Sequence, residues 1–216
     1  MSIADLWHEL AYWKSNQEPL IFRSGSEGGA SSIVIEPAHW LMPRELTGYN
    51  ASDYWVLSKS DQERLDRAVR DYNEIARSIS SDRRASGERI ARGQAELLII
   101  DDILGRERFP CWEAFALDQL LDRNQEALPP WIVGRQYRAD EDSTGAPALW
   151  VHFIVDDAGL ESESNYPDNM YAVRRNVSDI YTEHFLNGRS SFSTDRYLYV
   201  SFGGDDAGLG ENPGES

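Results

Sequence analysis

The 216-residue chain contains a single cysteine, Cys111, which excludes an internal disulfide bond. Its first residues lack the basic region and apolar segment of a secretory leader. No apolar run approaches the roughly 20 residues that a helix needs to cross a bilayer. These absences predict a cytoplasmic protein that does not span a membrane.

Positive charge is also scarce. The chain has 21 basic and 37 acidic residues, for a formal net charge of −16, and only Lys14 and Lys59 are lysine. Such a chain is poorly suited to grip a phosphate backbone, so direct binding of nucleic acid is not expected. The many arginines favour planar pairing with carboxylates, and we expect most of them in surface ion pairs.

A hydrophobic content of 41% is sufficient for a buried core. The pattern predicts an α+β protein with an N-terminal helix and β-hairpin, a central helical segment, a C-terminal ββαβ unit and a disordered acidic tail. Residues 1–128 would form the helix, hairpin and helical portion, residues 129–203 the ββαβ unit, and residues 204–216 the tail. One compact domain over residues 1–203 is the alternative.

The first part begins with a helix over residues 3–13, followed by two short apolar runs, "PLIFRS" and "SSIVIEP". These runs predict a hairpin, and the loop "GSEGGA" between them matches neither common phosphate-loop pattern. The initial helix has four apolar residues at helical spacing. They are Ile3, Leu6, Leu10 and Trp13.

Three helices are predicted in the centre. The first begins at Ser60, with Glu63 completing a capping box, the second covers residues 88–104, and the third begins at Pro110 and ends before Pro129. The first of them has the clearest apolar stripe. It consists of Leu65, Val69, Tyr72, Ala76 and Ile79.

From Trp131 the apolar period changes to two, which predicts strands at "WIVGRQYR", "ALWVHFIV" and "RYLYVSF" and a helix before the last strand. The helix stripe consists of Met170, Val173, Val177, Ile180 and His184. One face of the sheet would pack on this helix through Leu149, Val151, Phe153, Val155, Leu198, Val200 and Phe202.

The opposite face of the sheet carries the candidate binding residues. They are Trp150, His152, Tyr197 and Tyr199. This face either packs under the helical portion or is presented to a partner. Stacking of single-stranded bases also requires a positive groove, whereas residues 131–203 have 6 basic and 11 acidic side chains. If the face is open, a protein or peptide partner is expected.

The acidic stretch from Gln136 to Asp157 is the first of two candidate metal sites. Asp140, Asp142 and Gly145 resemble the start of an EF-hand loop, but the twelfth position is Val151 in place of glutamate. The turn-forming residues of "DEDSTGAP" favour a hairpin turn, with an irregular carboxylate site as the alternative.

Asp101 and Asp102 are the second candidate, because they lie in a predicted helix that is apolar on nearly every side. A carboxylate there needs a partner, a metal ion or a raised pKa. We expect an Arg–Asp pair between helices. The alternative is a metal-dependent hydrolase that adds carboxylates from the region of Asp140 and Asp142 or of Asp156.

Two further clusters are weaker candidates. Cys111 at a helix start could be an activated nucleophile, but the four histidines show no catalytic or metal-binding spacing, so an interior position is expected. The arginines of the local basic cluster would form a solvated helix end or meet a phosphate or an acidic partner. They are Arg83, Arg84, Arg89 and Arg92.

The functional hypothesis is therefore a non-catalytic interaction or accessory subunit without a cofactor. Its acidic surface and aromatic sheet face would bind another protein, and the charge suits a basic one. The alternatives are the metal-dependent hydrolase and a small-molecule sensor with a pocket between the helical and sheet parts.

Overall fold

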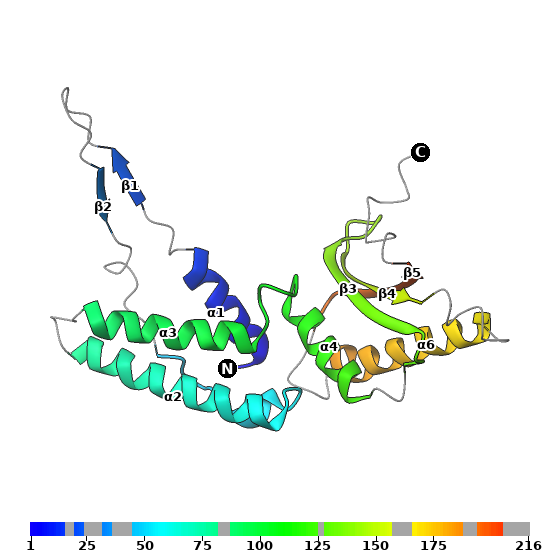
Figure 1. Ribbon diagram of the computed structural model, residues 1–216, viewed down its shortest axis with the longest axis horizontal. Coiled ribbons are helices and arrows are strands. Elements are labelled where there is room, and N and C mark those ends of the chain that lie inside the picture. The colour runs from blue at the N-terminus through cyan, green and yellow to red at the C-terminus, as the bar shows by residue number, and fades with distance from the viewer. Residues whose placement is uncertain are drawn as a thin grey trace. The chain divides into compact units, whose positions relative to one another are not determined.

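A computed structural model describes residues 1–15, 20–23, 32–35, 45–81, 87–124, 128–156, 166–187 and 194–204. It confirms the α+β class, with helices and a three-stranded mixed sheet (Figure 1). The chain divides into two compact units, Met1–Leu104 and Gly105–Ser216. The sequence analysis drew this division at residue 128. The predicted tail lies outside the described residues except for Gly204.

The first unit is mainly helical. Its helices are α1 (Ile3–Ser15), the 3₁₀ helix η2 (Ala51–Tyr54), α2 (Lys59–Ser81) and α3 (Gly87–Ile103). The predicted hairpin strands are present as β1 (Leu20–Arg23) and β2 (Ser32–Ile35), which pair antiparallel. The loop between them lies outside the described residues.

The cap of α2 differs from the predicted Ser60–Glu63 box. Ser58 caps the helix: its Oγ accepts a hydrogen bond from the backbone N–H of Asp61 at 3.1 Å and donates one to the Asp61 carboxylate at 2.7 Å. Ser58 and Asp61 therefore have the same three-residue spacing as the predicted pair but lie two positions earlier in the chain. Both pairs fit the sequence pattern of a cap, and only the position of the helix start selects between them.

The apolar stripe predicted for α2 is confirmed, because all five of its residues are buried. Helix α3 lies beside α2 and contributes Leu97 and Ile100 to the same core (Figure 1). In contrast, Leu98 and Ile99 of α3 are 53% and 39% exposed.

Within the described part of the chain, no helix is long and apolar enough to cross a membrane.

The second unit follows the predicted ββαβ order. Its elements are α4 (Trp112–Arg123), β3 (Ile132–Glu141), β4 (Pro147–Val155), α6 (Tyr166–Tyr181), the π-helical turn η4 (Thr182–Leu186) and β5 (Tyr197–Gly203). The strand order is β3-β4-β5, with β3 antiparallel and β5 parallel to β4. A parallel pair needs a long crossover, which here contains α6.

Helices α4 and α6 lie on the same face of this sheet (Figure 1). Tyr137 of β3 donates a hydrogen bond to Asp118 of α4, and Arg174 of α6 lies over the ring of Phe202 in β5. The β4 residues on this face are fully buried or nearly so, as predicted from the alternation. No helix among the described residues of this unit packs on the opposite face, where Tyr197 and Tyr199 are exposed, and we call it the open face.

The stripe of α6 is partly as predicted. Val173 and Val177 are buried, but the stripe continues into the core through Tyr181 and Phe185, which stack with ring centroids 4.7 Å apart. The π-helical turn adds a residue per turn and shifts the buried face by one position relative to a continuous α-helix. His184, predicted on the stripe, is only half-buried.

The opposite exposures of two leucines test the packing of the first unit. We expect Leu65→Ala in α2, which truncates a fully buried side chain, to lower the free energy of unfolding by about 2–5 kcal/mol. Leu98→Ala in α3 makes the same chemical change at a 53% exposed position, so its effect should stay within about 0.5 kcal/mol. Urea unfolding followed by circular dichroism measures both, and equal losses would contradict the assigned core face.

Candidate functional site

The open face of the C-terminal sheet carries a row of three stacked side chains, one from each strand. Arg138 of β3 is in register with Trp150 of β4, which is in register with Tyr199 of β5. The Arg138 guanidinium carbon lies 4.6 Å from the centroid of the Trp150 ring. The Trp150 and Tyr199 rings stack with centroids 5.4 Å apart and an interplanar angle of 17°. We call these residues the Arg138–Trp150–Tyr199 row.

The alternation of the strands explains the row. Neighbouring strands lie about 4.8 Å apart, so side chains in register on one face stand close enough to stack. An aromatic pair of this kind contributes about 0.5–1.5 kcal/mol beyond its buried area, and an exposed cation–π contact about 0.5–1 kcal/mol. These contacts favour the stacked conformation of the three side chains before any partner binds.

Three of the four predicted binding residues reach the surface. Tyr197 is 59% exposed and Tyr199 is 42% exposed, and Trp150 between its two stacking neighbours is half-buried. Tyr197 is in register with Ala148 of β4, which in turn is in register with Asp140 of β3. An acidic residue therefore shares the cross-strand row of the most exposed tyrosine on this face.

His152, the fourth predicted residue, lies on the same face but is only 4% exposed. Its Nδ1 is 2.9 Å from the Oγ of Ser201, its register partner on β5. Its Nε2 is buried and has no hydrogen-bond partner among the described residues. His152 therefore joins β4 to β5 and is not presented as a surface contact.

The acidic stretch between β3 and β4 forms a hairpin turn. The Oδ1 of Asp142 accepts hydrogen bonds from the backbone N–H and the hydroxyl of Thr144 and from the N–H of Ala146, at 2.8, 2.6 and 3.1 Å. Gly145 has a φ of +80°, a conformation that favours glycine. The carboxylate that resembled an EF-hand ligand thus organises the turn.

The second carboxylate oxygen of Asp142 connects this turn to the row. The Tyr199 hydroxyl donates a hydrogen bond to Oδ2 of Asp142 at 2.8 Å. The hydrogen bonds from Thr144 and Tyr199 lower the pKa of Asp142 to about 2, and the same bond to Asp142 raises the pKa of Tyr199. The turn and the row therefore stabilise each other's position on the open face.

Asp101 is buried as the apolar pattern of its helix predicted, but its ion-pair partner is a lysine. Lys14 of α1 places its Nζ 3.3 Å from Oδ2 of Asp101, and it is one of the two lysines in the chain. Asp102 has a 77% exposed side chain and lies 3.7 Å from Arg64 of α2. The two aspartates thus pair with two different helices.

The described residues contain no group of three or more histidine, cysteine, aspartate or glutamate side chains placed to hold a metal ion. Asp101 and Asp102 belong to the first unit, whereas Asp140 and Asp142 belong to the second. Neither unit therefore supplies such a group from its described residues.

Cys111 is 7% exposed at the start of α4, in agreement with the expected interior position. Burial raises the pKa of its thiol to about 12, and the neighbouring Glu113 acts in the same direction. The hydrogen bond from the backbone N–H of Ala114 lowers the pKa of the thiol but does not offset these effects. Cys111 is therefore protonated near neutral pH and is a poor nucleophile.

The sequence analysis missed a buried ion pair beside Cys111. Glu113 is 5% exposed, and its Oε1 accepts hydrogen bonds from the Thr194 hydroxyl at 3.0 Å and from the Arg196 Nε at 3.2 Å. These bonds attach the start of α4 to the segment that enters β5. Nothing in the sequence pairs residues this far apart, because an ion pair leaves no periodic pattern.

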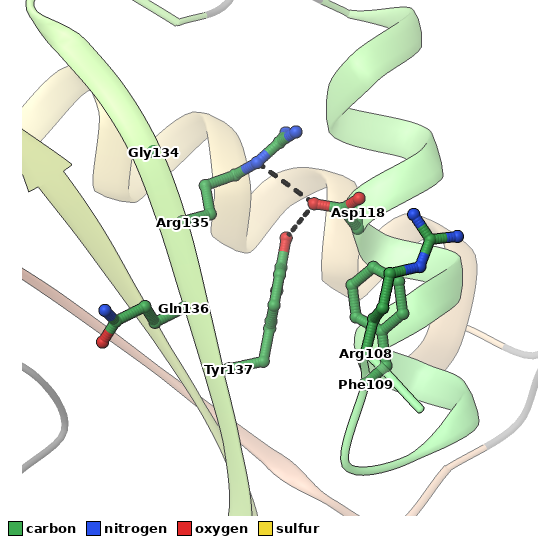
Figure 2. A pocket seen from close by; sticks show the side chains of 7 residues that line it. All are labelled: Arg108, Phe109, Asp118, Gly134, Arg135, Gln136 and Tyr137. Atoms are coloured by element: carbon green, nitrogen blue, oxygen red, sulfur yellow. Dashed lines mark hydrogen bonds and ion pairs between the residues drawn. The ribbon is translucent and has the colours of Figure 1, made fainter. Parts of the chain in front are cut away.

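A cavity of about 560 Å³ lies between α4 and β3 of the second unit (Figure 2). It is lined by Arg108, Phe109, Asp118, Gly134, Arg135, Gln136 and Tyr137. Asp118 is 3.1 Å from the Nε of Arg135 and accepts a 2.8 Å hydrogen bond from Tyr137. Burial raises the pKa of Asp118 and, together with Asp118, that of Tyr137.

These contacts join three of the lining residues, Asp118, Arg135 and Tyr137, in one network. The guanidinium of Arg135 also bonds to Asp122, so two carboxylates of α4, Asp118 and Asp122, compensate one arginine of β3. A ligand that used Arg135 would have to displace these partners, which a buried pair resists.

Of the predicted arginine cluster, Arg89 and Arg92 are exposed on α3, and the other two members lie outside the described residues.

The Asp142–Tyr199 hydrogen bond predicts a pH dependence. We expect Tyr199→Phe, which removes one donor, to raise the pKa of Asp142 from about 2 towards its ordinary 3.8. The Thr144 donors should keep the shift partial. A carbon-detected NMR titration of the Asp142 carboxyl measures it, with Tyr197→Phe as the matched control that should change nothing.

The sign of the stability effect follows from the lowered pKa. The carboxylate of Asp142 stabilises the folded chain above its ordinary pKa of 3.8, and this contribution is lost as the pH falls through about 2. The stability difference between the wild-type chain and Asp142→Asn should therefore shrink over this range. A difference that stays constant down to the lowest pH would contradict the assigned hydrogen bonds.

The environment of Cys111 predicts low reactivity. In the folded chain near neutral pH, a thiol with a pKa of about 12 and 7% exposure should react with an aromatic disulfide reagent at least a hundredfold more slowly than in urea. The absorbance of the released thiolate gives both rates. Rapid labelling of the folded chain would show that the thiol is exposed or ionised.

Comparison of the chain with protein-family models, curated proteins and solved structures finds no match.

Proposed function

We propose that the chain is a non-catalytic interaction subunit that binds a basic protein partner through the open face of its C-terminal sheet. The observation that carries this proposal is the Arg138–Trp150–Tyr199 row, which stands on a face that no described helix of its unit covers. Tyrosine, tryptophan and arginine are the residues most enriched among the dominant contacts of protein interfaces.

The rigidity of the row supports a binding role. A side chain that is already held in one conformation loses little entropy when a partner covers it, so its contact contributes more to affinity. Tyr199 is fixed by Trp150 on its ring and by Asp142 on its hydroxyl, yet it is 42% exposed. Exposed rings in fixed positions are suitable anchors.

The charge of the chain favours a basic partner. Asp142 bonds to the exposed Tyr199, Asp140 lies on β3 of the same face, and the whole chain has a formal net charge of −16. Complementary charge accelerates encounter and disfavours acidic competitors. The association should therefore weaken as the salt concentration rises, because exposed charges are screened.

The two competing functions have weaker support. A metal-dependent hydrolase would need Asp101, which already pairs with Lys14. A small-molecule sensor would use a cavity such as the one beside Asp118, where Arg135 and Tyr137 already bond to the Asp118 carboxylate.

The test is affinity purification of the tagged chain from its native cells at physiological salt. A stoichiometric basic partner should accompany the wild-type chain and be reduced at least tenfold by Tyr199→Ala or Tyr197→Ala, since dominant contacts cost about 2 kcal/mol or more. Tyr171→Ala is the matched control, because Tyr171 is 69% exposed but lies on α6.

Circular dichroism should confirm that each variant is folded. Recovery of the same partner with Tyr199→Ala, Tyr197→Ala and the wild-type chain would show that the interaction uses another surface. Recovery of the wild-type chain alone would remove the support for an interaction subunit.

A further inference from the structure

β5 is an edge strand whose outer side is available within the described residues. It pairs with β4 from Tyr197 to Gly203, and among the described residues it has no second neighbour. Alternate N–H and C=O groups of an edge strand point outwards and can pair with another chain. β5 has the sequence YLYVSFG. It contains neither a charged residue nor a proline, the residues that commonly block such pairing.

The Arg138–Trp150–Tyr199 row ends at this edge. Trp150 has a stacking neighbour on each side, whereas Tyr199 has Trp150 on one side and the edge of the sheet on the other. A strand added beside β5 would lie about 4.8 Å away and would place one side chain in register with Tyr199. That side chain would extend the row by one member.

The charges around this edge select the side chain. Asp142 bonds to Tyr199, and the exposed Asp195 lies two residues before β5. The one basic member of the row, Arg138, lies on β3 at the opposite side of the sheet. A cation beside Tyr199 would gain both cation–π and Coulomb attraction.

We propose that an extended, basic segment of a partner protein adds to β5 as a fourth strand and places an arginine or lysine side chain against the outer side of Tyr199. This inference rests on the proposed function and specifies its mode of binding: the backbone of the segment pairs with β5, and its cationic side chains recognise the tyrosines and carboxylates of the open face.

The probe is an eight-residue peptide of alternating arginine and valine with both of its termini blocked. It is added to the full chain at millimolar concentration and physiological salt. NMR hydrogen exchange of individual amides is the readout. We expect the peptide to slow the exchange of the outward-facing amides of β5 at least tenfold, because pairing buries them. Amides of β3, the other edge strand, serve as the internal reference and should be unaffected.

Two matched peptides separate strand addition from attraction of opposite charges. The same peptide with its four central residues N-methylated keeps its charge but loses the backbone donors, so it should not protect β5. The peptide with glutamate in place of arginine keeps the donors and should bind at least tenfold more weakly. Equal protection by the N-methylated peptide, or no protection of β5 by the parent peptide, would overturn the proposal.

The variants distinguish this inference from the proposed function. Tyr199→Ala should reduce the affinity for the parent peptide severalfold, and Tyr171→Ala should not change it. If Tyr199→Ala abolishes capture of the cellular partner while the parent peptide leaves β5 exchange unchanged, the surface is correct and strand addition is wrong. If Tyr199→Ala leaves capture unchanged, the proposed function itself fails.

Discussion

The register of β4 between its two neighbours is the constraint on which the C-terminal unit depends. One set of β4 residues, with Phe153 at its centre, is fully buried against the helices, and the alternate set places Trp150 in the stacked row. A shift of one residue would exchange these sets and expose the core. The apolar face therefore fixes the register, and the register in turn places Arg138 and Tyr199 on either side of Trp150.

Periodic features of this chain could be predicted from its sequence, whereas contacts between distant residues could not. The stripe of α2 and the alternation of β4 are repeated over several residues, so they identified the buried faces correctly. The cap of α2 was misplaced because two serine–acid pairs with the same spacing occur near its start. The Glu113–Arg196 pair joins residues 83 positions apart and leaves no local signal.

In the candidate site, too, periodic features could be predicted from the sequence, whereas contacts between distant residues could not. Alternation placed Trp150, Tyr197 and Tyr199 on one face, but it could not show that His152 on that face is buried and bonded to Ser201. Arg138 was missed because its position depends on the pairing of β3 with β4. The turn chemistry of Asp142 was predictable from its neighbours, whereas its bond to Tyr199 required the parallel arrangement of β5.

The parallel pairing of β4 with β5 also has a consequence for the order of folding. β3 and β4 are joined by a tight turn and can pair early, but His152 and Ser201 are separated by 49 positions, so β5 must close a long loop that contains α6. Long-range pairs of this kind form slowly. We therefore expect β5 to dock late during folding, so that the edge of β4 stays uncovered longest and is the place where a folding intermediate would self-associate.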